Sequence, residues 1–307
     1  MPWWRRSSHS DDRAGVSLEG GRASVVAIRR SASGPVLRGR ASETLPEGGL
    51  DARMLDRLAE RAGARGMSTH LVLVEDDYQL QMIEAPRVES SELKAAVRWK
   101  VKDLIDFHID DAVFDAFAIP GKSDSPQARD MMYAVVSRRR RIAELVQAFH
   151  RSDLELEAID IPELALRNLA RLDDADARGM VTLHLGAGSG LVILTRQGEL
   201  YISRRLGANA ASGADPSNYD DILLEIQRSM DFYTSHFGQP RPAALGVVPG
   251  FAGDERIVDW MAGQLDFDVR LLEPGSLLEA RPGLDADLDA SQMVALGGAL
   301  RTEDVRL

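Results

Sequence analysis

Short apolar runs separated by glycine-bearing turns occur twice, once near the start of the chain and once past its middle. Residues 15–40 read GVSLEGGRASVVAIRRSASGPVLRGR, and residues 181–204 read VTLHLGAGSGLVILTRQGELYISR. In each segment an apolar run, a turn, a second run, a turn and a third run follow one another, which is typical of antiparallel strands joined by tight turns. The repetition predicts two similar three-stranded units, one opening each half of the chain.

Between these units the pattern changes several times. Residues 50–62 place apolar side chains on one helical face, and residues 69–74 and 78–83 are strand-like up to Pro86. After Pro86 the chain predicts a helix, two strands, a helix and a third strand that starts at Leu154. The first of these helices follows Ser90 and Ser91, and its apolar stripe extends to Ile105. This order predicts a small sheet covered by helices, inserted between the two repeats.

The second half contains the longest helical pattern. Residues 218–237 repeat apolar positions at helical spacing, whereas residues 243–250 and 269–274 are strand-like and residues 257–265 helical. Pro162 is suited to the first turn of a further helix. Near residue 300 the run ALGGAL has two glycines in a helical pattern, which indicates that another backbone approaches closely there.

Composition narrows the range of functions. The chain has 307 residues, 44% of them hydrophobic, which suffices for a substantial core. A net charge of −11 and a pI near 5.1 argue against a general nucleic-acid binder. The lack of cysteine excludes disulfides, thiol nucleophiles and thiolate metal sites. No run is long enough to span a membrane and the first residues lack the apolar core of a signal peptide, so we expect a cytoplasmic protein.

Several segments together resemble one family. Residues 92–116 read ELKAAVRWKVKDLIDFHIDDAVFDA, residues 222–238 read ILLEIQRSMDFYTSHFG, and residues 295–301 read ALGGALR. With the two repeats, they resemble the PilM family of type IV pilus assembly proteins, in particular its MSHA (agglutinin) pilus biogenesis branch, which is MshI-like. The resemblance implies an α/β, actin-like (ribonuclease H-like) two-lobed fold with an inserted subdomain, as in the bacterial division protein FtsA.

The resemblance also implies a division of the chain. Residues 1–13 are expected to be a flexible tail. Residues 14–86 form the first lobe, continued by residues 161–178 and 288–307. Residues 87–160 form the inserted subdomain, and residues 179–287 form the second lobe, including helix 218–237.

The turns that bind nucleotide in this fold depart from the family pattern. A magnesium–nucleotide needs carboxylates beside the amides that hold its phosphates, yet Ser17 and His184 stand where the aspartates are expected. At the turn expected to bind adenosine the chain has Pro249 and Phe251 around a glycine. The degenerate nucleotide or anion-binding turns comprise Gly15, Ser17, Gly20, Gly21, His184, Gly186, Gly188, Ser189, Gly190 and Gly250.

These departures predict a pseudo-ATPase with no catalytic residue and no cofactor. Hydrolysis of ATP and tight binding of magnesium–ATP are not expected, although backbone amides from Gly186 to Gly190 remain able to cradle an anion. A plain glycine–serine hairpin explains the same turn. His184 is either a packed, hydrogen-bonded residue or a metal ligand or base; without a second ligand at suitable spacing we favour the first and expect no metal.

The family implies a scaffold of a pilus assembly platform, without enzymatic activity. It lies at the cytoplasmic face of the inner membrane and binds the cytoplasmic tail of a PilN-type inner-membrane partner, in a groove between the first lobe and the insert. We expect Arg98, Trp99 and Lys102 to line that groove. The alternatives are an actin-like ATPase of the same machinery and the cytoplasmic platform domain of a type II secretion system. A homo-oligomer is left open.

Four consecutive arginines form a further candidate surface. Arg138, Arg139, Arg140 and Arg141 stand at a predicted helix start, where the helix dipole disfavours positive charge. They are either a solvated turn or a contact for acidic lipid head groups or an acidic partner. The second reading rests on the lack of a compensating acid before them in the sequence.

Overall fold

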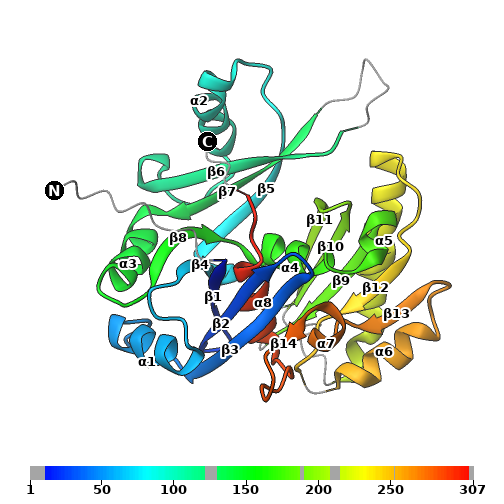
Figure 1. Ribbon diagram of the computed structural model, residues 1–307. Helices are drawn as coiled ribbons and strands as arrows, with labels where there is room; N and C mark the ends of the chain where they lie inside the picture. Colours follow the sequence, from blue (N-terminus) through cyan, green and yellow to red (C-terminus); the bar gives the residue numbers. More distant parts are fainter. Residues whose placement is uncertain (1–10, 122–129, 187–189, 208–214, 252, 304–307) are drawn as a thin grey trace.

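Three β-sheets and the helices around them make up the part of the protein that the structure describes (Figure 1). The computed structural model describes residues 11–121, 130–186, 190–207, 215–251 and 253–303. Residues 1–10 of the expected tail lie outside these ranges, and the expectation is wrong for Asp12 and Arg13, which already belong to the first strand. Among the residues described, no helix has both the length and the apolar character needed to cross a membrane.

The first repeat forms the centre of a six-stranded sheet with the order β14-β3-β2-β1-β4-β8. Its strands are β1 Asp12–Glu19, β2 Arg22–Ser31, β3 Gly34–Thr44, β4 Ser68–Val72, β8 Glu155–Asp160 and β14 Glu279–Ala280. The predicted meander is confirmed, since β2 pairs antiparallel with both β1 and β3. Gly20 and Gly21, with φ of 57° and 70°, form the two-residue turn that the twist of a hairpin favours.

The second repeat forms the corresponding part of a five-stranded sheet with the order β11-β10-β9-β12-β13. Its strands are β9 Met180–Leu185, β10 Gly190–Arg196, β11 Glu199–Leu206, β12 Ala244–Val247 and β13 Asp268–Leu271. Every residue of β9 is buried because helices cover both faces of this sheet. The strands predicted here from the sequence are confirmed.

The third sheet belongs to the insert and has the order β5-β7-β6. Its strands are β5 Tyr78–Glu84, β6 Ala112–Ile119 and β7 Met131–Arg138, and α2 (Ser90–Val101) covers one face. The predicted composition of this sheet is wrong in two places. The strand near Leu154, β8, pairs with β4 of the first sheet, and β5, assigned to the first lobe, pairs with β7. Alternation along a strand specifies which face is buried and does not specify the neighbouring strand.

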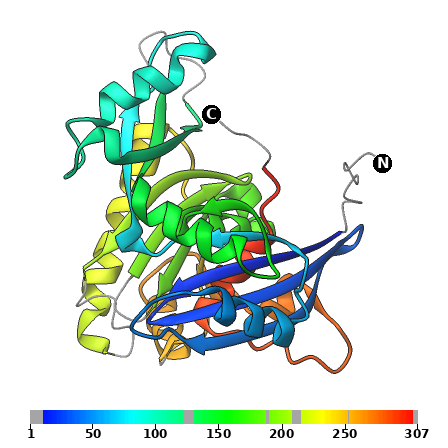
Figure 2. The ribbon, with the colours of Figure 1, turned by 90° about the vertical axis from the view of Figure 1, so that its left-hand side faces the viewer.

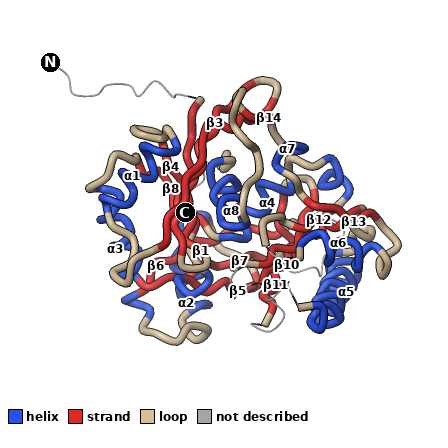
Figure 3. The backbone as a smooth tube through the Cα atoms, turned by 90° about the horizontal axis from the view of Figure 1, so that it is seen from below, coloured by secondary structure: helices blue, strands red, loops and turns tan. Residues whose placement is uncertain are grey.

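The remaining helices form layers around the two large sheets (Figures 2 and 3). α1 (Ala52–Ala62) and α3 (Arg139–His150) lie on the outer side of the first sheet, and α5 (Tyr219–Phe237) and α6 (Asp254–Ala262) on the outer side of the second. Between the sheets lie α4 (Pro162–Ala170) and α8 (Ala290–Ala299). The short elements are η1 Glu75–Asp77, η2 Ile109–Asp111, η3 Asp174–Arg178, η4 Pro216–Asn218 and α7 Pro274–Leu277.

The predicted helices are confirmed, with one marked difference in length. α2 ends at Val101, and Leu104, which the predicted stripe includes, is 47% exposed. Val97 and Val101 are fully buried against the insert sheet. Ile105, beyond the end of the helix, is partly buried against the same cluster, so Leu104 is the residue of the predicted stripe that the insert leaves exposed.

α8 is the central helix, and all ten of its residues are buried. Asp289 and Gln292 form a capping box at its start. The close approach predicted from its two glycines is confirmed. A Cβ added at Gly297 would lie 2.2 Å from the carbonyl oxygen of Ala165 on α4, and one at Gly298 would lie 2.8 Å from a methyl of Val72 on β4. α8 therefore packs tightly against both its neighbouring helix and the first sheet.

Candidate functional site

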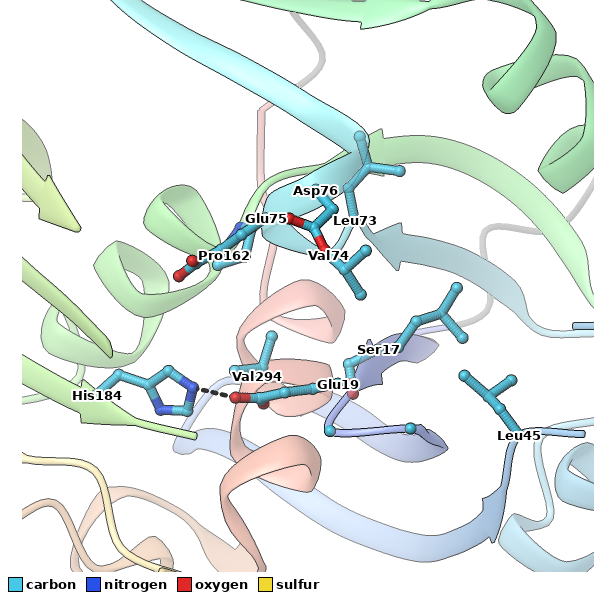
Figure 4. A pocket seen from close by; sticks show the side chains of 13 residues that line it. Ser17, Glu19, Leu45, Leu73, Val74, Glu75, Asp76, Pro162, His184 and Val294 are labelled. Atoms are coloured by element: carbon cyan, nitrogen blue, oxygen red, sulfur yellow. Dashed lines mark hydrogen bonds and ion pairs between the residues drawn. The ribbon is translucent and has the colours of Figure 1, made fainter. Parts of the chain in front are cut away.

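A cavity of about 430 Å³ lies between the two lobes, where the two repeats face each other (Figure 4). The end of β1 and the turn after it, Leu45 after β3, the loop after β4, the start of α4, one residue of β9 and one of α8 enclose it. The lining residues are Ser17, Leu18, Glu19, Gly20, Gly21, Leu45, Leu73, Val74, Glu75, Asp76, Pro162, His184 and Val294. Ser17 and His184, predicted from the repeats to mark equivalent places, do lie around one cavity.

A hydrogen-bonded ion pair crosses this cavity. His184 Nε2 lies 2.7 Å from Glu19 Oε1, and the two side chains are 4% and 15% exposed. Burial alone lowers the pKa of His184, but the charge and hydrogen bond of Glu19 outweigh it, so the pKa is raised above its ordinary value. His184 is thus the hydrogen-bonded residue that the sequence favours, and it joins the second lobe to the first.

The hydroxyl of Ser17 is engaged within the protein. Ser17 Oγ donates to the carbonyl oxygen of Ser291 on α8 at 2.6 Å. Ser291 Oγ donates to Ser24 Oγ at 2.9 Å, and Ser24 Oγ lies 2.8 Å from Ser42 Oγ. This chain of hydroxyls connects β1, β2 and β3 to the first turn of α8, so Ser17 serves the attachment of that helix.

Three glycines of the predicted nucleotide turns have packing roles. A Cβ at Gly15 would lie 1.8 Å from the carbonyl oxygen of Ala295, and one at Gly250 would lie 2.4 Å from the backbone nitrogen of Ala290. Gly190, at the start of β10, would place a Cβ 3.0 Å from the side chain of Leu206. Close approach of α8 or of a neighbouring strand therefore explains these glycines without a ligand.

The other glycines of the set have different places. Gly20 and Gly21 form the tight turn that carries Glu19 into the cavity. Gly186 directly follows β9. Gly188 and Ser189 lie outside the described residues, so the predicted anion cradle is not tested.

A second polar group, which the sequence did not predict, lies beside the ion pair. Tyr78 Oη donates to Glu163 Oε2 at 2.5 Å. The guanidinium of Arg205 lies 4.6 Å from the ring of Tyr78 and donates to the carbonyl oxygen of Glu75 at 3.1 Å. Burial raises the pKa of Glu163 and also that of Glu75. Only tertiary folding brings these side chains together, and their separate positions at a strand start and a helix start gave no signal of it.

The charge around the cavity is unfavourable for a polyphosphate. Glu19, Glu75 and Asp76 contribute carboxylates, and no lysine or arginine is among the lining residues named above. Phosphate binding requires donors and positive charge. In the described part of the chain, no group of three or more histidine, aspartate or glutamate side chains is arranged to hold a metal ion.

A second hollow, here called the insert groove, lies between the insert and the first lobe. It measures about 160 Å³ and is lined by Asp115, Ala116, Phe117, Val135, Ile159, Asp160, Ile161, Leu164, Arg167, Arg301 and Glu303. β6 and β8 are the outermost described strands of their sheets, and each contributes consecutive residues to the lining. The groove is therefore bordered by strand edges as well as by side chains.

The predicted partner-binding residues lie elsewhere. Trp99 is 71% exposed on α2, with Lys102 Nζ 5.2 Å from its ring, and Arg98 forms an ion pair with Asp110. α2 packs against Ala134 and the other side chains on one face of the insert sheet, whereas Val135 of the opposite face lines the groove. The prediction that Arg98, Trp99 and Lys102 line the groove is wrong. Their role in binding a partner on another surface stays a prediction.

Each of the four arginines has an internal partner. Arg138 pairs with Asp106 and lies over the ring of Phe107, and Arg139 donates to the carbonyl oxygen of Ala112. The other two pairs are Arg140 with Glu144 at 2.9 Å and Arg141 with Asp77 at 2.8 Å. The premise that these charges are uncompensated is wrong for Arg138, Arg140 and Arg141. The acids that pair with Arg138 and Arg141 come from segments that only folding brings near. Their contact with lipid or a partner stays a prediction.

Comparison with known proteins then places the architecture. No protein-family model matches the chain, and no curated protein matches it in sequence. A chain in the solved structure of a PilM–PilN type IV pilus biogenesis complex superimposes with a TM-score of 0.73 at 20% identity, covering 94% of this chain and 97% of that one. The chain has an actin-like fold. The predicted fold class is confirmed.

Two further structures match over most of the chain but with lower scores. The cytoplasmic domain of EpsL, an inner-membrane component of the type II secretion system of Vibrio cholerae, has a TM-score of 0.49 at 13% identity, covering 87% of this chain and 99% of that one. A protein of Bacteroides thetaiotaomicron with an actin-like ATPase fold and unknown function has a TM-score of 0.48 at 8% identity, covering 88% and 94%.

Proposed function

We propose that this chain is a scaffold of a type IV pilus assembly platform that binds an extended cytoplasmic segment of an inner-membrane partner. The observation that carries the proposal is the insert groove, bordered by the edges of β6 and β8. Similarity in fold to a chain of the PilM–PilN complex supports the class of partner, a PilN-type protein. The segments 92–116 and 222–238 support the MSHA branch. In this role the protein works in the cytoplasm, at the inner membrane, through that partner.

The groove has the features that recognition of an extended peptide requires. Outermost strands present backbone N–H and C=O groups that an added strand can pair with. Side chains of Phe117, Val135 and Ile159 provide an apolar floor for alternate side chains of such a strand. Asp160 and Arg167 add charged groups of both signs. This combination favours a peptide over a small ligand.

We further propose that the protein does not hydrolyse ATP. The places of both magnesium-directed carboxylates hold Ser17, which is bound to α8, and His184, which is paired with Glu19. The ion pair and the neighbouring acids line the cavity between the two repeats, where their negative charge disfavours a polyphosphate. An ATPase of the same machinery remains the second candidate, and a nucleotide titration decides between them.

Titration of the purified protein with labelled ATP and magnesium tests the proposal that the protein does not hydrolyse ATP. We expect neither saturable binding nor turnover. Turnover that survives purification and is lost on Gly186→Val would show an active nucleotide site at the second repeat and overturn the pseudo-ATPase assignment.

A binding assay tests the groove. A fluorescent peptide with the sequence of the cytoplasmic tail of the neighbouring PilN-type pilus protein is titrated with wild type, Phe117→Ala and Trp99→Ala. We expect Phe117→Ala to weaken binding about tenfold or more, since truncating a central aromatic contact costs about 2 kcal/mol. Trp99→Ala, on the opposite face of the insert sheet, should leave binding unchanged. Weaker binding by Trp99→Ala with unchanged binding by Phe117→Ala would show that the partner binds the exposed face of α2.

A further inference from the structure

Part of this chain already occupies the insert groove. After α8 the segment Arg301–Glu303 rises between the first lobe and the insert, as the red trace in Figures 1 and 2 shows, and Arg301 and Glu303 line the groove. This segment reaches the groove from the central helix, far from β6 and β8 in the sequence. Its contacts indicate what the groove recognises.

Two buried charges of the groove bind this segment. Asp160, at the end of β8, has a side chain 2% exposed and lies 3.0 Å from Arg301 Nη1. Arg167, on α4, has a side chain 9% exposed and forms an ion pair with Glu303. Burial raises the pKa of the Glu303 carboxyl, but the charges of Arg167 and Arg301 and backbone hydrogen bonds together lower it by more, so the net shift is downward. Asp160 thus binds Arg301 and Arg167 binds Glu303, and the two bound residues are two positions apart in the sequence.

Asp160 and Arg167 each require a counter-ion, whether it comes from this chain or from a partner. A buried charge that loses its counter-ion is strongly destabilising, because little water replaces the lost interaction. The main-chain N–H of Ile161 also donates to Asp160, and Arg167 also donates to Asn168, but these neutral groups do not compensate the charges. Any peptide that displaces Arg301 and Glu303 must therefore supply a cation to Asp160 and an anion to Arg167.

We propose that the insert groove is a receptor for an extended segment with a basic and an acidic side chain two residues apart, and that Arg301–Glu303 is its ligand in the free protein. The proposal rests on the proposed function for the identity of the competing partner. It adds the charge pattern that the partner must carry and a competitor within the same chain. The apparent affinity for a partner then equals the affinity of the free groove multiplied by the fraction of molecules whose groove is free.

The test uses two labelled peptides and the full-length chain. The first peptide repeats residues 296–307, and the second exchanges the arginine and glutamate equivalent to Arg301 and Glu303. Glu303→Gln, which preserves side-chain volume, and Arg301→Ala with Glu303→Ala release the groove; Arg98→Ala with Asp110→Ala removes an ion pair on the other face of the insert as a control. Thermal unfolding verifies that each variant is folded.

We expect the first peptide to bind the released variants about tenfold or more tightly than wild type or the control, which corresponds to about 1.4 kcal/mol. The exchanged peptide should not bind. Equal binding of the first peptide to all variants, or equal binding of both peptides, overturns the proposal.

A third titration, with the tail of the PilN-type protein, separates this inference from the proposed function. A tail that binds wild type and the released variants equally would refute the internal ligand and leave the proposed function standing. Binding of the first peptide without any binding of the tail would support the charge pattern and refute the PilN-type partner.

Discussion

His184 Nε2 and Glu19 Oε1 lie 2.7 Å apart across the cleft, 165 residues apart in sequence. The pair connects β9 of the second lobe to the end of β1, two residues after Ser17, which is the place in the first repeat equivalent to His184. The two segments expected to bind one nucleotide are thus hydrogen-bonded to each other. The stability of the closed cleft should depend on the charge of this pair.

The pH dependence of stability follows from the raised pKa of His184. The folded protein holds the proton more tightly than the unfolded chain, so the stabilisation is complete below the ordinary pKa of 6.5 and is lost as the pH rises through the raised value. Urea unfolding of wild type and His184→Gln should therefore show a difference in free energy that is largest below pH 6.5 and shrinks as the pH rises through the raised pKa of His184.

His70 provides a control of opposite sign. Burial lowers its pKa, although its hydrogen-bond contact with the carbonyl oxygen of Gly298 acts against the shift. The folded state binds this proton less tightly, so the contribution of His70 should grow as the pH rises from the lowered pKa to 6.5 and be complete above that. The same trend for His184→Gln and His70→Gln would contradict the ion pair as the cause.

Gly15→Ala should destabilise the protein strongly. The added Cβ would lie 1.8 Å from a backbone oxygen of α8, so the helix must move, at a cost of about 1–3 kcal/mol or more. Gly48→Ala is the matched control, because nothing lies within 4 Å of its added Cβ, and it should change the free energy of unfolding by less than about 0.5 kcal/mol. A small effect at both positions in urea unfolding would show that α8 tolerates displacement.

Tyr78→Phe should cost about 1–3 kcal/mol of stability, because it removes the 2.5 Å hydrogen bond to the buried carboxyl of Glu163. The change should cost less in the Glu163→Gln background, where no charge is left without its donor. A double-mutant cycle by chemical denaturation measures this coupling. Equal costs in the two backgrounds would mean that the tyrosine stabilises the cleft through its ring alone.

Two of the four consecutive arginines should differ in their effect on stability. Arg141→Gln leaves the carboxylate of Asp77, 11% exposed, without its ion pair and should cost about 1–3 kcal/mol. Arg140, 90% exposed, pairs with Glu144 at the surface, and Arg140→Gln should cost less than about 0.5 kcal/mol. If liposomes with anionic lipid bind wild type and not Arg140→Gln, this exposed arginine acts outside the molecule.

Local sequence patterns were sufficient to predict most of the helices and strands of the fold. The two meanders were predictable because glycine turns and strand periodicity are both local, and the repeat placed Ser17 and His184 at equivalent points. The choice of neighbour for β5 and β8 was not predictable, since each is compatible with either sheet edge. Strand pairing is decided by the chain path between the elements.

The location of the candidate site was predictable from the sequence, whereas the contacts within it were not. The family resemblance predicts an aspartate where Ser17 stands, but the sequence does not show that the hydroxyl binds Ser291, 274 residues away. The same limit applies to Arg141 and Asp77, 64 residues apart. Charge clusters in a sequence therefore cannot be judged as uncompensated before the fold is known.

The position of α8 in the chain also affects how the protein is made. Every element against which α8 packs, including β1, β2, β4 and α4, is synthesised before it. Until residue 299 has left the ribosome, the inner face of the first sheet has no cover and its apolar side chains face solvent or a chaperone. The core of the first lobe, which begins at residue 12, is therefore completed only after residue 299 has been translated.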